Sequence, residues 1–582
     1  MSTPSPVAET EVLIVGAGPA GASAAALLAS YGISCVVINK YPGVANTPRA
    51  HITNQRAMEV LRDLGLEEKA TAASTPQRLM GEHVYATSLS GREFGRLRTW
   101  YTHPHFQAEH DLASPCSLCD LPQDQLEPIL INAAASRGAS VRFNTELVDF
   151  TQDADGVTAL VADRVTGARY GIRSKYMIGA DGGNSLVMEK LGLPLVGAMG
   201  GGGSVNIVFE ADLTRLVEHR PGDMYWFLQS GAGHDGLGIG VLRMVRPWNR
   251  WIGVWGYDEA AGTPELTDED AVAIAHRLIG DDTIPVKVES VSIWSINHVY
   301  ATDNMAGRVF CAGDAVHRHP PMNGLGSNTS IQDSYNLCWK LALVLRGQAS
   351  PALLETYREE RVPVAEQIVK RAGASNALIP ALFQALDLPA APDEHSMARA
   401  VAALEAPTAE GTERRRAFEK AMHATLIGFN AHGVETNQRY SSRAVLDDGV
   451  AEPPASRDEE LYYYASTHPG RHIPHVWLTK DQHRVPLFDL CGKGVFTLLI
   501  GPRGEAWREA AAKASADLGI PLQVHSIGLG CDYEDSYGDY TALPAITEST
   551  ALLIRPDHTI AAHPADPETL TATLTALLHP TA

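Results

Sequence analysis

Glu11-Val-Leu-Ile-Val15-Gly16-Ala17-Gly18-Pro19-Ala20-Gly21 joins a short apolar run to a glycine-rich turn. The apolar run is typical of a buried parallel strand. A helix of small residues is expected from Ala20 to Ser30, and a second strand from Cys35 to Ile38. Strand, helix and strand together predict a βαβ unit at the start of an α/β fold.

Each glycine of this motif has a physical role in holding a dinucleotide. Gly16 permits the tight turn, Gly18 lets the backbone approach a pyrophosphate, and Gly21 allows close packing of helix on strand. Pro19 and Ala20 begin the helix, whose free N–H groups carry a partial positive charge. We therefore predict that these five residues bind a dinucleotide.

The acidic residue expected about 20 positions later, which would accept from a ribose hydroxyl, is absent. Asn39 stands in its place and Lys40 follows it. An asparagine side chain can still bond a hydroxyl, so both residues are predicted to contact the adenosine half.

Two later motifs also place an acid where a predicted strand ends. Residues 176–185 place Asp181 at the end of one strand, and residues 308–317 place Gly313 and Asp314 at the end of another. The Asp314 carboxylate can accept from sugar or ribityl hydroxyls. A loop rich in proline and glycine, residues 320–328, then leads into a helix whose first N–H groups would face the ligand.

A second glycine match does not predict a second nucleotide site. Gly231, Gly233 and Gly236 have the same spacing, but residues 237–245 are typical of a strand, so the necessary helix N-terminus is missing. One dinucleotide-binding fold is expected, and any second nucleotide would bind transiently.

Composition excludes several classes of protein. The net charge of −21 argues against a nucleic-acid partner. No signal peptide is expected in the first ten residues, and no stretch approaches the ~18 apolar residues of a membrane span. Seven scattered cysteines indicate the cytoplasm. Cys116 and Cys119 are interpreted as a coincidental C-x-x-C, and no metal site is expected.

The order and spacing of the three motifs resemble those of the group A flavoprotein monooxygenases, the aromatic hydroxylases related to p-hydroxybenzoate hydroxylase. Residues 38–41 and 48–65 are similar to the subgroup of 2,4-dichlorophenol 6-monooxygenases and 2-hydroxybiphenyl 3-monooxygenases, in which Asn39 in place of the acid is normal. Residues 469–471 and 554–557 resemble the thioredoxin-like C-terminal domain of phenol hydroxylases. The resemblance covers nearly the whole chain.

The fold class expected is α/β: a Rossmann-like FAD-binding domain, an inserted antiparallel-sheet substrate domain and a C-terminal thioredoxin-like domain. The FAD-binding domain is predicted to be discontinuous, in residues 1–80, 118–196 and 297–375. The substrate domain takes residues 81–117 and 197–296. A helical segment and linker occupy residues 376–455, and residues 456–582 form the last domain, without a C-x-x-C.

The resemblance implies resident FAD, with NAD(P)H and O2 as transient co-substrates. NAD(P)H would reduce FAD, and a flavin C4a-hydroperoxide would hydroxylate a phenol or hydroxypyridine, ortho to its hydroxyl. A homo-oligomer, dimer or tetramer, is also implied. The implied cofactor contacts are Gly16, Gly18, Pro19, Ala20, Gly21, Asn39, Lys40, Arg49, Gln123, Asp181, Gly313, Asp314, Pro321, Gly324, Gly326, Ser327 and Asn328.

A phenolate is a stronger nucleophile than a phenol, so the reaction needs a base near the substrate hydroxyl. His51 is the candidate, because its ordinary pKa lies near the working pH; the alternative is a packed structural histidine. Asp120 would orient it or relay its proton. The loop at Pro321 would stabilise the charge of the reacting oxygen. Met224, Trp226 and Arg243 are candidate substrate contacts, or ordinary sheet residues.

Two departures from the family pattern stand out: Leu186-Val187-Met188 follows Ser185 where an arginine is usual, and Asn323 replaces a loop glycine. Two other functions stay open. The same motifs would serve a biosynthetic hydroxylase of a polyketide-type aromatic compound, because they build the flavin site and not the substrate pocket. They would also serve a non-catalytic flavoprotein that binds such a ligand.

Overall fold

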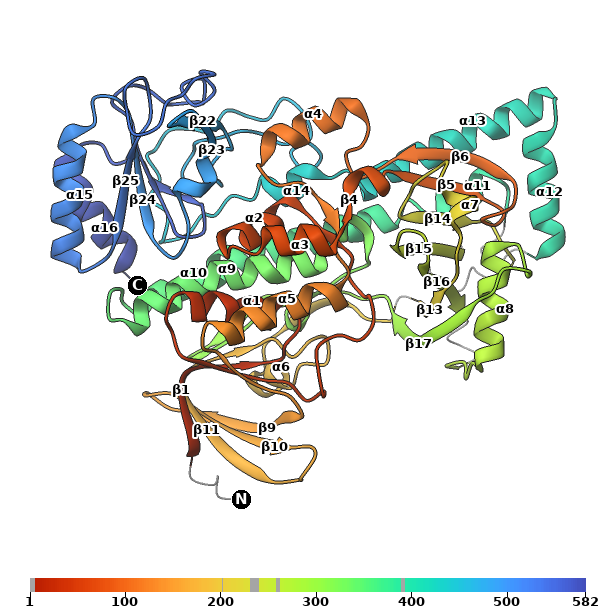
Figure 1. The fold of residues 1–582 in the computed structure, drawn as a ribbon, viewed down its shortest axis with the longest axis horizontal. Coiled ribbons are helices and arrows are strands. Elements are labelled where there is room, and N and C mark those ends of the chain that lie inside the picture. Colours follow the sequence, from red (N-terminus) through yellow and green to blue (C-terminus); the bar gives the residue numbers. More distant parts are fainter. Residues whose placement is uncertain (1–5, 201, 231–239, 258–261, 389–392, 582) are drawn as a thin grey trace.

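The computed structural model describes residues 6–200, 202–230, 240–257, 262–388 and 393–581. Figure 1 shows three regions along the long axis, with the C-terminal domain at one end and a separate β-sheet region at the other. The rejected glycine match at Gly231, Gly233 and Gly236 lies outside the described residues. No helix in the described ranges combines the length and apolarity needed to cross a membrane.

The central sheet is built mainly of parallel strands. Its core order is β20-β11-β1-β2-β8. The bounds of these strands are β1 (Pro6–Val15), β2 (Cys35–Ile38), β8 (Ser140–Arg142), β11 (Arg169–Gly179) and β20 (Val309–Cys311). An antiparallel hairpin of β9 (Thr145–Gln152) and β10 (Val157–Asp163) extends β11. The predicted βαβ unit is confirmed, because β1 pairs with β2 in parallel and α1 (Pro19–Ser30) lies between them in the chain.

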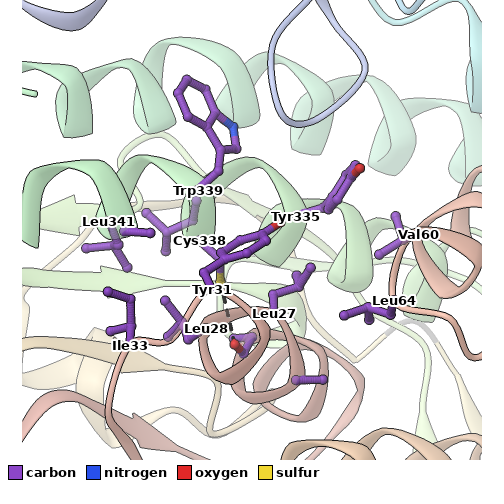
Figure 2. Close-up of a cluster of buried hydrophobic side chains, with 14 of the residues drawn as sticks. Leu27, Leu28, Tyr31, Ile33, Val60, Leu64, Tyr335, Cys338, Trp339 and Leu341 are labelled. Carbon is purple, nitrogen blue, oxygen red and sulfur yellow. Dashed lines mark hydrogen bonds between the residues drawn. The ribbon is translucent and has the colours of Figure 1, made fainter. Parts of the chain in front are cut away.

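Helices cover one face of this sheet. They include α1, α2 (Gln55–Asp63), α5 (Gln123–Ser136), α9 (Gly326–Leu345) and α10 (Ala352–Asn376). Figure 2 shows how α1 and α9 meet: Leu27 and Leu28 of α1 point toward Cys338 of α9. The Cys338 thiol also donates to the Ala24 carbonyl at 3.7 Å. The small residues of α1 allow this close approach, which buries α9 almost completely.

A seven-stranded sheet forms the second region. Its order is β17-β13-β16-β15-β14-β5-β6. The strands are β5 (Glu82–Ala86), β6 (Glu93–Arg98), β13 (Gly203–Glu210), β14 (Met224–Phe227), β15 (Gly240–Arg246), β16 (Arg250–Tyr257) and β17 (Lys287–Ser295). The sheet is antiparallel as predicted, except that β14 and β5 pair in parallel. That pair joins residues 82–98 to the later strands.

The two faces of this sheet have different covers. Helix α8 (Asp268–Ile279) packs on one face with Val84, Ile207 and Leu242. The helices of residues 380–424 pack on the other face, where Tyr85, Trp226 and Val241 point. These helices are α11 (Pro380–Ala385), α12 (Glu394–Glu405) and α13 (Ala409–Ala424). The second face is therefore the one that also lines the cavity described below.

The C-terminal domain has its own four-stranded sheet. Its order is β25-β24-β26-β27, with helices α15 and α16 alongside. The elements are β24 (Phe496–Ile500), α15 (Glu505–Leu518), β25 (Leu522–Ser526), β26 (Ala551–Ile554), β27 (Ile560–Ala562) and α16 (Leu570–Leu578). Arg555 of this domain donates to Glu360 of α10, and Glu360 also pairs with Lys340 of α9. The predicted α/β fold class with a separate C-terminal domain is confirmed; the residue limits of the domains stay a prediction.

Candidate active site

The three motifs converge because the strands that precede them are neighbours. In the register of the central sheet, Val15 of β1 lies opposite Gly179 of β11, and Gly179 lies opposite Cys311 of β20. The carboxyl ends of parallel strands meet at one edge of a sheet, where α/β folds bind ligands. Segments separated by more than a hundred residues therefore form one site.

Two glycines of the first motif are required by backbone contacts. A Cβ on Gly16, whose φ is +104°, would lie 2.1 Å from the Ala180 carbonyl oxygen. A Cβ on Gly21 would lie 2.0 Å from the Gly16 carbonyl oxygen. At Gly18 the nearest atom outside the turn is a Glu127 carboxylate oxygen, 3.8 Å away, so this backbone stays open to a ligand.

One cavity of about 1150 Å³ extends from this sheet edge to the second sheet. It is lined by most of the predicted cofactor residues. These are Gly16, Gly18, Pro19, Ala20, Asn39, Lys40, Arg49, Gln123, Asp181, Asp314, Pro321, Gly324, Gly326 and Ser327. The helices α1 and α9 both begin at its wall, so two sets of free N–H groups face the same space.

Three predicted cofactor residues do not line the cavity. Gly21 packs against the turn behind it. Gly313, at φ +66°, donates its N–H to Asp333. Asn328 donates to the Ile52 and Gly324 carbonyls and accepts from the Asn54 N–H. These three residues pack behind the cavity and hold the backbone that lines it.

The lining residues fit a flavin dinucleotide. Three buried polar atoms in residues 318–323, before α9, have no hydrogen-bond partner among the described residues: Arg318 Nε, His319 Nε2 and Asn323 Oδ1. Such atoms are costly unless a ligand or water satisfies them. Arg318 and His319 also line the cavity. The glycine cradle and the two helix N-termini suit a diphosphate, and the unsatisfied polar atoms of Arg318 and His319 suit a polar ring edge.

The two acids of the later motifs differ in what they can do. The Asp181 carboxylate accepts from Ser185 Oγ at 2.5 Å and from Val187 N–H, and so caps the helix α6 (Leu186–Leu191). The Asp314 carboxylate has no hydrogen bond to any residue in the described ranges, and its side chain opens into the cavity. Desolvation of the carboxyl at the cavity wall raises the pKa of Asp314, although the charges of His317, Arg318 and Arg49 oppose this shift. Asp314 is thus the acid available to a ligand hydroxyl.

The structure shows where both departures from the family pattern lie, and it explains the one at Asn323. Residues 186–188 form the first turn of α6, which Asp181 and Ser185 cap. Asn323 has φ +65°, a left-handed conformation that asparagine tolerates better than other non-glycine residues. Its amide donates to the Ile427 carbonyl at 2.7 Å, which fixes the loop before α9. Asparagine therefore replaces glycine there without loss of the loop.

At the other end of the cavity, His51, Asp120 and Arg243 form a buried group. His51 Nδ1 lies 3.3 Å from Asp120 Oδ1, and His51 Nε2 lies 3.0 Å from the Pro48 carbonyl oxygen. The Arg243 guanidinium lies 3.3 Å from Asp120 Oδ2. Burial and the charge of Arg243 lower the pKa of His51, and Asp120 opposes them. His51 is thereby a neutral base near neutral pH.

The walls at this end are mostly apolar. They include Ile52, Trp100, Met224, Trp226, Val241, Ile252, Val254, Met322 and Phe429. The predicted contacts His51, Met224, Trp226 and Arg243 all line the cavity, while Asp120 lies behind His51 with no exposed surface. Pro321, at the loop before α9, lines it as well.

Sequence reasoning missed several residues of this end. Trp100 has φ +51°, a conformation that no local pattern announces. Its indole N–H donates to Asp223 at 3.0 Å, and Asp223 also lies 3.4 Å from Arg243. Phe429 comes from the helical region after residue 376. Only Asp223 carried a sequence signal, as an acid directly before the predicted strand at Met224.

Comparison with known proteins agrees with this geometry. Residues 9–372 match the model of the FAD binding domain family, and residues 466–581 match that of the aromatic-ring hydroxylase C-terminal domain. The chain belongs to the FAD-dependent aromatic-ring hydroxylases. The predictions of FAD as cofactor and of monooxygenase chemistry with NAD(P)H and O2 are therefore confirmed for this hydroxylase.

Three relatives of the hydroxylase are instructive. A 2,4-dichlorophenol 6-monooxygenase of Delftia acidovorans is 55% identical over 560 residues, which cover 96% of each chain. A phenol 2-monooxygenase of Pseudomonas sp. (strain EST1001) is 45% identical, over 97% of this chain and 92% of that protein. The crystal structure of the flavin-dependent monooxygenase PieE with FAD and substrate is 41% identical, with a TM-score of 0.94 over 98% of this chain and 99% of that one.

Proposed function

We propose that this hydroxylase inserts one oxygen atom ortho to the hydroxyl of an uncharged phenol. The observation that carries the proposal is the place of His51, Asp120 and Arg243 at the apolar end of the cavity whose other end has the FAD motifs. The names of the dichlorophenol and phenol monooxygenase relatives support the same substrate class.

The protein residues supply the proton chemistry. His51 accepts the proton of the phenol, so that the ring becomes a phenolate and its ortho carbon gains nucleophilicity. Asp120 stabilises the imidazolium that results, at 3.3 Å. Arg243 Nε is buried and has no partner among the described residues, so it can donate to the phenolate oxygen. FAD, when bound, supplies oxygen activation with electrons from NAD(P)H.

The walls exclude water and select an uncharged ring. Trp100, Trp226 and Phe429 lie in one buried cluster, and their ring centroids are 5.6–6.1 Å apart for the two pairs that include Phe429. Arg243, the cation at this end, is already flanked by Asp120 and Asp223. A substrate carboxylate would meet those two buried acids, whereas halogen or alkyl substituents suit the apolar walls.

A direct test uses the purified holoenzyme with 2,4-dichlorophenol, NADH or NADPH, and air. We expect substrate-dependent oxidation of the nicotinamide, equal oxygen uptake and a product heavier by one oxygen, with the new hydroxyl ortho by NMR. The matched control is 2,4-dichloroanisole, which fits the same walls and has no proton to lose. Equal turnover of the anisole and the phenol would contradict the role of His51, and no turnover of any phenol would contradict the proposal.

A larger phenolic ring system of the polyketide type is the second candidate. The observation that favours it is 31% identity to a putative polyketide hydroxylase of Streptomyces halstedii over 94% of this chain, together with 34% identity to a tetracenomycin A2 monooxygenase-dioxygenase of Streptomyces glaucescens over 95% of this chain. Hydroxypyridines remain within the proposed class because they also ionise. A substrate screen scored by product mass separates these possibilities.

We also infer a homo-oligomer that works in the cytoplasm. The supporting feature for the compartment is that all seven cysteines are unpaired, six of them buried, which suits a reducing environment. Light scattering at several protein concentrations would test the oligomer, and cell fractionation would test the compartment.

A further inference from the structure

A chain of buried polar side chains continues beyond Arg243, away from the cavity. Asp223 Oδ2 lies 3.4 Å from Arg243, and Asp223 Oδ1 lies 2.9 Å from Nε2 of His83. Asp223 and His83 have no exposed surface. The indole N–H of Trp226 completes the chain, 3.4 Å from His83 Nδ1. Trp226 is also a wall of the substrate end of the cavity.

These contacts determine the protonation state of His83. An indole N–H can only donate, so His83 Nδ1 must offer a lone pair to Trp226. A carboxylate can only accept, so the one N–H of the ring is on Nε2 and points to Asp223. His83 is therefore the neutral Nε2–H tautomer, because a second proton would point Nδ1–H at the indole N–H.

Few other charged groups lie near this series of buried side chains. On the strands around His83, β6 places Leu97 opposite it, and Tyr85 pairs its hydroxyl with Thr425. Phe429 packs on the His83 ring, with centroids 4.1 Å apart. Beyond Phe429, the Glu435 carboxyl accepts from the Tyr101 hydroxyl, and burial raises the pKa of Glu435 to about 8, which keeps it neutral at pH 7.

The charges of the chain do not balance when His83 is neutral. Asp120 and Asp223 contribute two negative charges and Arg243 one positive charge, so one negative charge is uncompensated. His51 is the remaining group of the chain that can take a proton. Both of its partners, the Asp120 carboxylate and the Pro48 carbonyl, are acceptors, as a protonated imidazole requires.

We propose that Trp226 and His83 are positioning residues. The Trp226 indole keeps His83 neutral, so that this buried group of side chains has a net charge of −1 before the reaction and stabilises on His51 the proton that leaves the phenol. The phenolic O–H bond breaks, an N–H bond forms on His51, and the chain becomes neutral while the phenolate faces Arg243. The inference rests on the proposed function, since it assigns His51 as the proton acceptor. It gives the Trp226 indole a chemical role in addition to its role as a wall.

The test measures ionisation of a bound phenol, without turnover. The probe is 4-nitrophenol, whose phenolate is yellow, added to the FAD holoenzyme in the absence of NAD(P)H. Difference spectra over a pH series give the apparent pKa of the bound probe. In the wild type we expect it below the value in free solution, and in His51→Ala we expect that lowering to be lost.

Trp226→Phe removes the indole N–H but keeps an aromatic wall. His83 can then take a second proton, which neutralises the chain before substrate binds. We expect the pKa of the bound probe to rise by about one unit, a tenfold loss of phenolate at a given pH. The matched control is Trp294→Phe, whose indole N–H donates to the Asn206 side chain at 2.9 Å, so the pKa of the probe should not change.

A double variant distinguishes the effect of a second proton on His83 from the effect of changed packing at position 226. His83→Gln offers an amide that can donate to Asp223 and accept from Trp226 but cannot be protonated. The double variant Trp226→Phe/His83→Gln should therefore return the pKa of the bound probe to the wild-type value. A Trp226→Phe variant with an unchanged pKa, or a double variant shifted as far as Trp226→Phe alone, would overturn the proposal. Identical pKa values in wild type and His51→Ala would instead overturn the role of His51 itself.

Discussion

The imidazole of His51 and the carboxylate of Asp120 lie 3.3 Å apart, although 69 positions separate them in the chain. A short antiparallel pair joins them, because Ile52 of β3 (Ile52–Thr53) lies opposite Asp120 of β7 (Cys119–Asp120). The Leu121 N–H also donates to the His51 carbonyl at 2.8 Å. Backbone pairing therefore fixes the distance between the candidate base and its acid.

Asp120→Asn keeps the shape of this pair and removes its charge. The imidazolium of His51 then loses its main stabilising partner, and Arg243 loses one of its two acids. We expect kcat/KM for hydroxylation to fall by about 100-fold, at the lower end of the range for general base catalysis. The measurement is the rate of formation of the hydroxylated product, identified by its mass, compared with the rate of nicotinamide oxidation. Asp111→Asn, at an exposed carboxylate, is the control and should keep wild-type activity.

The acid limb of the pH profile should report His51. Burial and Arg243 lower its pKa below the ordinary value of 6.5. The base is active when neutral, so kcat/KM stays constant as pH falls through 6.5 and declines only at lower pH. The profile is measured with a phenol whose own pKa lies well above the range. An acid limb above 6.5 would show that another group limits the reaction.

Gly16→Ala should prevent FAD binding. The new methyl would lie 2.1 Å from the Ala180 carbonyl oxygen, in a backbone of φ +104°. We expect a loss of about 3 kcal/mol or more in stability and a colourless protein. Gly32→Ala is the control, since its φ is +72° but nothing lies within 4 Å of the new atom. That variant should lose only about 1 kcal/mol and stay yellow; equal loss of flavin in both would contradict the steric argument.

Glu360→Gln should loosen the C-terminal domain. Glu360 accepts from Arg555 and Lys340 inside the protein, and these cations, together with the Asn336 amide, outweigh burial and hold its pKa below the usual range. The amide introduced by Glu360→Gln is neutral, so the buried cations Arg555 and Lys340 lose the negative charge that they share. We expect the free energy of unfolding to fall by about 3–5 kcal/mol. Thermal unfolding and limited proteolysis measure this. Glu359→Gln, half-buried against Arg443, should cost under about 1 kcal/mol.

Glu435 should make stability depend on pH. Burial raises its pKa in the folded protein to about 8 from 4.5, although the Tyr101 hydroxyl opposes the shift. The folded chain then holds a proton that the unfolded chain loses, so stability falls as pH rises from 4.5 to 8 and is level above that. The stability of Glu435→Gln relative to the wild type should increase as pH rises across this window, by up to about 5 kcal/mol. A difference in Tm that is constant from pH 5 to pH 8 would contradict the shift.

The FAD-binding end could be predicted from the sequence because its requirements are local. Gly16, Gly18 and Gly21 follow a strand and begin a helix, and Asp314 ends another strand, so each can be recognised from its neighbours in the chain. Asn39 stands where the motif usually has an acidic residue, and it is still a polar residue at the cavity; its amide donates to the Gly43 carbonyl. Turn geometry and helix N-termini depend on short stretches, which is why these motifs identify a fold.

The substrate end depended on tertiary structure. Trp226 and Met224 could be named as strand residues, but Asp223 and His83 become partners only through the parallel pairing of β14 with β5. Trp100 and Phe429 come from segments with no local pattern that would reveal their role. Sequence alone determined the family, the cofactor and the candidate base, because these rest on local backbone requirements. The arrangement of buried charges around that base was decided only by the fold, because burial and charge pairing depend on residues distant in the chain.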